Sequence, residues 1–150
     1  MRYLLFPFFF SLFFAGHRSV SLPGRPAPVQ DSVPVLLKGQ FADDYDIRYT
    51  ITDSLWTQHP NARYHILKWN TKEQYIIARN DDGNPGEKGL YSRIDYMLFS
   101  NMEPWRWGFC LTIYNAPSDS LAEAQAVADR KNPRKGCNGY PFSRMKRVEK

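Results

Sequence analysis

The sequence predicts a mainly β fold, an antiparallel meander that forms a small barrel or a strongly curved sheet. One C-terminal helix packs outside it, and one disulfide ties the chain. Three observations predict this class: several segments alternate with a period of two, one alanine-rich segment has helical character, and the chain has two cysteines. Strands and helices do not alternate along the chain as they do in parallel-sheet proteins.

The N-terminal segment is typical of an export signal. Arg2 precedes an apolar run that ends at Ala15, and the small residues Ser19 and Ser21 follow at the spacing of a cleavage site. The run is shorter than the roughly 20 residues of a membrane-spanning helix, and Pro7 interrupts it. Residues 1–21 are therefore predicted to be a signal peptide, with an uncleaved anchor as the alternative.

Residues 22–35 contain four prolines and are typical of an extended linker. The remaining residues, 36–150, form one predicted domain. Its core is modest for its size and would benefit from a covalent cross-link.

The strands follow from the alternation of side chains. In residues 45–52 one face carries Tyr45, Ile47, Tyr49 and Ile51. Segments 63–69 and 74–80 are rich in β-formers and are joined by a four-residue hairpin loop. Two more strands are predicted over 90–99 and 106–114.

The strand over 106–114 is predicted to bury Trp107, Phe109, Leu111 and Ile113 together. Cys110 then points to the opposite side of the sheet. On the preceding strand, Arg93 and Asp95 share the outer face, where a cross-strand ion pair is expected.

The helix is predicted over 120–132. Ser120 and Glu123 have the spacing of a capping box, and Pro133 ends the segment. Leu121, Ala124, Val127 and Ala128 are expected to form the stripe that packs on the sheet.

An exported chain with an even number of cysteines is expected to pair them. Cys110 and Cys137 would then fasten the C-terminal segment across the outer surface of the sheet. Two free thiols, or a bond between chains, are the alternatives.

The C-terminal segment is strongly basic, whereas residues 22–129 carry more acidic than basic side chains. We expect the basic tail to lie along the acidic body of its own domain, with an anionic surface as the alternative partner. Nucleic acid is not an expected partner, and no oligomeric state is predicted. The eight basic residues are Arg130, Lys131, Arg134, Lys135, Arg144, Lys146, Arg147 and Lys150.

Four tryptophans suggest a binding site. An aromatic-walled cavity in a small barrel would take a flat or apolar ligand, and an arginine would anchor a carboxylate. The alternative is that the rings fill the core. The candidate ligand-binding residues are Trp56, Trp69, Arg79, Arg93, Trp105 and Trp107. Trp105 and Trp107 are expected on one face.

Signals for metal, cofactor or catalytic chemistry are weak. The loop 80–87 is rich in Asp and Asn, but its spacing does not match a calcium loop, so a surface loop is expected. His59 and His65 are not spaced as a helical ligand pair, and no nucleophile motif occurs. No cofactor, metal or catalytic residue is predicted, although a carboxylate pair would leave no local signature.

The order of a strand meander, a late helix and a C-terminal segment bridged to a strand resembles a lipocalin-type arrangement. The Gly-x-Trp signature of the first lipocalin strand is absent, and the nearest stretch carries Gly39 and Phe41. The phrases DDYDIRYTI, YHILKWN, QYIIARND, GLYSRID and GCNGYPFSRM are also similar to a group of small exported bacterial proteins. That resemblance implies a periplasmic or secreted location and transfers no site residue.

The resulting prediction is an exported, non-catalytic small-ligand-binding module with an aromatic-lined pocket. A structural or interaction protein of the cell envelope with a filled core is the alternative. A hydrolase with an unrecognised carboxylate site comes third.

Overall fold

The computed structural model describes residues 33–125 and 127–148. The predicted signal peptide and nearly all of the predicted linker lie outside these residues.

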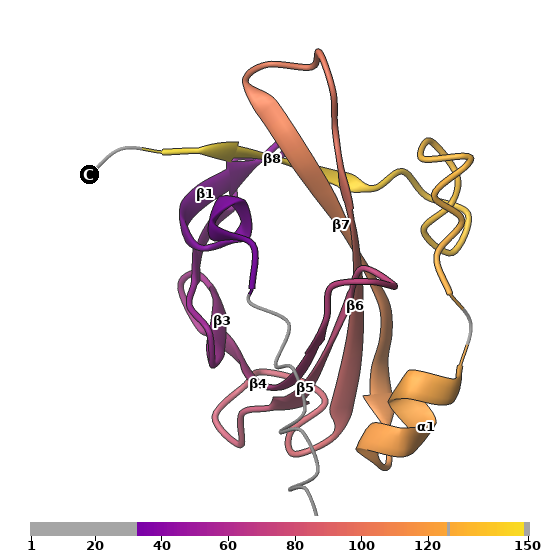
Figure 1. Cartoon of the computed structure of the whole chain (residues 1–150). Helices are drawn as coiled ribbons and strands as arrows, with labels where there is room; N and C mark the ends of the chain where they lie inside the picture. The colour runs from indigo at the N-terminus through magenta and orange to yellow at the C-terminus, as the bar shows by residue number, and fades with distance from the viewer. Residues whose placement is uncertain (1–32, 126, 149–150) are drawn as a thin grey trace, which may run out of the picture.

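The chain forms a closed antiparallel barrel of eight strands in sequence order, in which β1 pairs with β8 (Figure 1). A short 3-10 helix, η1 (Val35–Leu37), precedes it. The strands are β1 (Gly39–Asp43), β2 (Arg48–Ile51), β3 (Leu55–Gln58), β4 (Ala62–Asn70), β5 (Tyr75–Asn80), β6 (Tyr91–Leu98), β7 (Trp105–Ala116) and β8 (Ser143–Arg147). The mainly β class, the single C-terminal helix and the barrel are thus confirmed.

The five segments predicted from alternation correspond to β2, β4, β5, β6 and β7. Three strands were not predicted: β1, β3 and β8. Each has only four or five residues, and no alternation extends beyond it as it does over residues 45–52 around β2. The prediction that the C-terminal tail only straps the sheet is therefore incomplete, because its last part is the strand that closes the barrel.

The helix α1 (Asp119–Ala124) is shorter than predicted. Its N-cap is Ser118, whose hydroxyl accepts a hydrogen bond from the Leu121 amide, so the predicted capping box at Ser120 is wrong. The side of α1 that packs on the barrel also differs from the predicted stripe. Ala122 is fully buried, whereas Leu121 and Val127 are exposed.

Because of irregularities in strand pairing, two side chains of β7 do not lie on the face that was predicted for them. The pairing register with β8 shifts between Trp105 and Trp107, so these two side chains do not share a face. The register with β6 also shifts near Arg93, and Ile113 packs with Tyr75 and Ala122 under α1 instead of inside the barrel. A β-bulge adds one residue to one strand and therefore reverses the facing of the residues beyond it.

The disulfide between Cys110 and Cys137 is present, with a Cα–Cα distance of 5.4 Å. It fastens the segment between α1 and β8, residues 127–142, to the outer face of β7. Ala128 and Phe142 pack beside it and are buried. Gly136 is required there, because a Cβ atom would lie 1.9 Å from the Asp129 carbonyl oxygen.

Candidate functional site

The inside of the barrel is occupied by aromatic rings. Phe109 lies 5.0 Å from Trp56, centroid to centroid, and 5.5 Å from Tyr49. Trp107 lies 5.2 Å from Phe41 and 5.9 Å from Trp56. Rings this close are in direct edge-to-face contact, so no ligand fits between them.

Polar groups of Trp107 and Tyr49 are buried with these rings. The Trp107 Nε1–H has no hydrogen-bond partner in the described structure. The Tyr49 hydroxyl donates to Asp43 Oδ2 over 2.9 Å. Burial, and secondly the negative charge of Asp43, raise the pKa of Tyr49, which therefore stays protonated.

The six predicted ligand-binding residues do not come together. Trp56 and Trp107 are inside the barrel, and Trp69 lies at the edge of the same cluster, where its Nε1 donates to the Asp53 carbonyl. The other three residues are on the outer face: Trp105, Arg79 and Arg93.

Each of these three has a protein partner. Arg144 and Lys146 lie over the Trp105 ring. Arg79 pairs with Asp82, and Arg93 pairs with Asp95. The expected arginine anchor for a carboxylate inside the barrel is therefore wrong, because the side chains at 79 and 93 alternate outward.

One end of the barrel is covered by the loop 81–90. Asn84 in this loop is buried and bonds to both the amide and the carbonyl of Arg63. The cavity beneath, lined in part by Tyr64 and Leu111, measures about 170 Å³. This is below the roughly 300 Å³ of small-molecule sites.

The acidic side chains of the same loop also bind protein groups. Asp81 accepts from His65 over 2.6 Å and from the Gly83 amide, and both bonds lower the pKa of Asp81. In the described residues, no group of three or more His, Cys, Asp or Glu could hold a metal ion.

A larger hollow, about 580 Å³, lies on the outside of the barrel; we call it the outer groove. It runs between the β6–β7 hairpin, which projects at the top of Figure 1, and residues 133–144. Its lining residues are Asp44, Met97, Phe99, Met102, Pro133, Arg134, Pro141, Phe142 and Arg144.

The floor of the groove follows from strand register. Met97 on β6 pairs with Gly108 on β7, which pairs with Arg144 on β8. Because Gly108 has no side chain, the Phe99 ring lies directly against β7. A Cβ at Gly108 would be 2.8 Å from Phe99 Cζ and 3.0 Å from the Ser143 carbonyl oxygen. The glycine thus allows the Phe99 ring, which lines the groove, to pack against β7.

The walls of the groove are apolar and adaptable. Phe142 is buried, whereas Met102 at the tip of the hairpin is 40% exposed. Methionine side chains can repack around ligands of different shape. In size and lining, this groove meets the description of a small-molecule site, and the barrel interior does not.

The charged side chains that line the groove sum to a net positive charge. Arg144 donates to Asp44 from its Nε over 2.9 Å and from its backbone amide over 3.2 Å, so these two charges offset each other. Arg134 is exposed, and no carboxylate of the described chain pairs with it.

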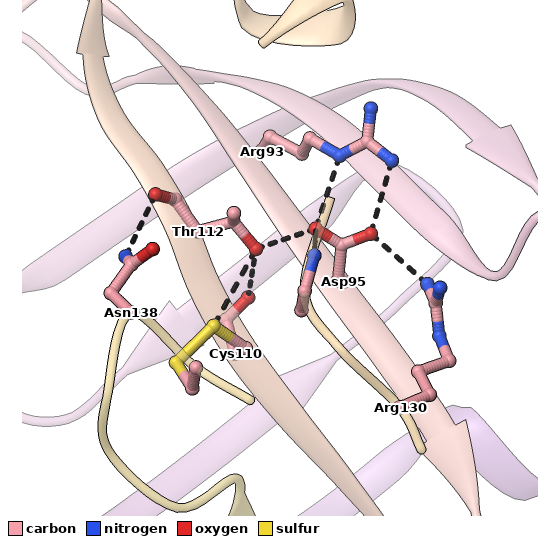
Figure 2. The surroundings of a disulfide bond; sticks show 8 residues. Arg93, Asp95, Cys110, Thr112, Arg130 and Asn138 are labelled. Atoms are coloured by element: carbon pink, nitrogen blue, oxygen red, sulfur yellow. Dashed lines mark hydrogen bonds and ion pairs between the residues drawn. A yellow bond between two sulfur atoms is a disulfide. The ribbon is translucent and has the colours of Figure 1, made fainter. Parts of the chain in front are cut away.

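A buried ionic network lies next to the disulfide (Figure 2). Asp95 Oδ2 accepts from Arg93 Nε over 3.0 Å and from Thr112 Oγ1 over 2.5 Å. Asp95 Oδ1 accepts from Arg93 over 3.1 Å and from Arg130 over 3.0 Å. With every oxygen already used by protein donors, this carboxylate has a structural role. The predicted cross-strand surface pair is therefore wrong: Arg93 and Asp95 lie on one strand and are covered by the segment that carries Arg130.

Comparisons of the chain with protein-family models, with curated proteins and with solved structures find no significant match. No helix in the described part of the chain is long and apolar enough to cross a membrane.

The outer groove was not predicted from the sequence, although two signals were present. Gly108 stands alone among larger residues in a strand, which indicates a close approach by another group. Met97, Phe99 and Met102 also cluster around the turn that precedes this strand. Neither signal shows that residues 133–144 form the second wall.

Proposed function

We propose that this protein is an extracytoplasmic, non-catalytic module that binds a small apolar ligand in the outer groove. The observation that carries the proposal is a hollow of about 580 Å³ with Met, Phe and Pro walls. Ligand sites of about 300–1,000 Å³ with apolar linings and few polar groups are typical.

Two features support the extracytoplasmic location. The disulfide between Cys110 and Cys137 needs an oxidising compartment to persist. The N-terminal sequence has the layout of an export signal. The resemblance to small exported bacterial proteins, including the GCNGYPFSRM phrase around Cys137, agrees with this location.

The lipocalin-like arrangement supports a binding role, with one difference. Lipocalin-type barrels hold a ligand inside, whereas here Trp56, Trp107 and Phe109 contact one another in that space. The proposal therefore places the ligand outside the barrel.

The packed interior favours a second candidate, a structural or interaction protein of the cell envelope. In that case the exposed apolar side chains of the β6–β7 hairpin, Leu98 and Met102, would contact a protein partner.

Binding of the neutral fluorescent probe N-phenyl-1-naphthylamine separates the two candidates. We expect saturable one-site binding that Met102→Glu weakens at least about tenfold, because a charge in the apolar wall would be desolvated by the ligand. Leu98→Glu is the matched control, since Leu98 is similarly exposed on β6 but does not line the groove. No saturable binding, or equal effects of both substitutions, would contradict the groove as a ligand site.

A further inference from the structure

The charges at the outer groove indicate which class of ligand it takes. We propose that the ligand is a single-chain amphiphile with an anionic head group, a carboxylate in its simplest form, and that Arg134 binds this head group. This inference rests on the proposed function and names the chemistry of the same site.

Arg134 has no acidic partner among the residues that the structure describes. Arg93 and Arg130 are paired with Asp95, Arg144 with Asp44, and Arg79 with Asp82. Arg134, in contrast, lines the groove and forms no ion pair within the described residues.

Asp44, the acidic residue of the groove, already forms an ion pair with Arg144. Asp44 accepts from the Arg144 guanidinium and from the Arg144 amide, so both of its oxygens face protein donors. The Arg144 guanidinium is held further by the Trp105 ring, 5.0 Å away. An anionic ligand would therefore meet one unpaired cation and a neutralised ion pair, which gives a net attraction.

The lining of the groove around Arg134 also suits an amphiphile. Pro133 and Pro141 flank it on the same wall, and the apolar side chains of Met97 and Phe142 lie deeper. A ligand with its head group at Arg134 would extend an apolar chain along the groove floor toward Phe99. A guanidinium donates two parallel hydrogen bonds to a carboxylate, so it fixes orientation as well as charge.

The experiment compares decanoate, decanol and decyltrimethylammonium, three probes with the same chain and different head groups. The two ions are titrated below their micelle concentrations and decanol below its solubility limit, each as a competitor of N-phenyl-1-naphthylamine at pH 7.5 and physiological ionic strength. We expect decanoate to bind about fivefold more tightly than decanol, as for an exposed charged pair, and the cation to bind most weakly.

The variant Arg134→Gln should lower the affinity for decanoate to that for decanol and leave decanol binding unchanged. Lys135→Gln is the matched control, because it removes the same charge from an exposed neighbouring residue that does not line the groove. Circular dichroism melting checks that both variants are folded.

The outcomes separate this inference from the proposed function. Equal binding of decanoate and decanol to the wild type, or equal losses in both variants, would overturn the head-group assignment while groove binding stands. Failure of all three probes to displace the fluorophore, together with no effect of Met102→Glu, would overturn both.

Discussion

A single buried carboxylate, that of Asp95, joins three parts of the chain. It lies on β6, and its oxygens accept from Arg93 on the same strand, from Thr112 on β7 and from Arg130 in the C-terminal segment (Figure 2). The side chain of Asp95 is fully buried and that of Arg93 nearly so. Buried charges of this kind are tolerated only when each is fully paired.

Replacing Asp95 with Asn should therefore destabilise the fold by about 3–5 kcal/mol, because Arg93 would remain buried without its counter-charge. Urea unfolding measures the loss. Asp82→Asn is the control, since the Asp82–Arg79 pair is exposed, and we expect a change of no more than about 0.5 kcal/mol. A similar small effect at Asp95 would show that the network does not secure the C-terminal segment.

Glu123 connects α1 to the barrel, as Asp95 connects the C-terminal segment to it. Its carboxylate accepts from Lys68 on β4 over 2.5 Å and from the Tyr75 hydroxyl on β5. The bond from Lys68, and next the bond from Tyr75, lower the pKa of Glu123. A carboxyl with a lowered folded-state pKa stabilises the fold above its unfolded pKa, and this stabilisation is lost as pH falls through the folded value.

Glu123→Gln should thus cost about 0.5–1 kcal/mol at pH 7, a small value because the side chains are partly exposed. The difference between wild type and variant should shrink between pH 7 and pH 3, because the stabilisation by the Glu123 carboxylate is lost as the pH falls toward its folded-state pKa. Urea unfolding at the two pH values checks this. Glu103→Gln, at an exposed pair 3.9 Å from Arg106, should show almost no difference at either pH. A loss that is independent of pH would contradict the account.

The C-terminal strand β8 is one of the three strands that the sequence did not predict. Its five residues include three basic side chains, which made the segment look like a solvated tail. In the structure, basic and apolar side chains alternate between the two faces of β8. Arg144 and Lys146 point outward over Trp105, while Met145 is completely buried in the core. One apolar residue between two charges is too weak a pattern to identify a strand without its neighbours β1 and β7.

Adjacent substitutions in β8 test its place in the barrel. Met145→Ala should cost about 2–5 kcal/mol, as expected for truncating a fully buried methionine. Lys146→Ala should cost no more than about 1 kcal/mol, because Lys146 makes only a long ion pair and a ring contact. Chemical unfolding of both variants is sufficient. Comparable effects would mean that this segment lies on the barrel rather than within it.

The longer elements were predictable because packing and periodicity agree in them. In β2, Tyr49 and Ile51 point inward as predicted, and in β6 Ile94 and Tyr96 point inward, opposite the outer face that carries Arg93 and Asp95. Prediction fails where the pairing register shifts, as at Trp105 and Ile113, because a bulge reverses facing without any local sequence signal. The predicted helix is longer than α1 because the alanines after Ala124 favour a helix. In the structure, the segment that follows Ala124 is instead held on β7 by the disulfide.

In the whole molecule, closure of the barrel explains why the proposed ligand site lies outside it. A barrel of this size has an interior that side chains just fill, and here large aromatic residues occupy it. The number of aromatic residues in the sequence indicated an aromatic interior but could not distinguish the lining of a ligand cavity from a filled core. The outer groove depends on contacts between β6, β7 and residues 133–144, which are far apart in the sequence until the disulfide and β8 bring them together.

The methionines provide a direct test of the proposed ligand site. The chain has four: Met97 and Met102 line the groove, Met145 is in the barrel core, and Met1 belongs to the predicted signal peptide. A titration of methyl-¹³C-methionine protein with decanoate, followed by NMR and assigned with single Met→Leu variants, reports on each site separately. The account predicts saturable shifts at Met97 and Met102 and an unchanged Met145. A shift at Met145 with none at Met97 or Met102 would place the ligand inside the barrel and contradict it.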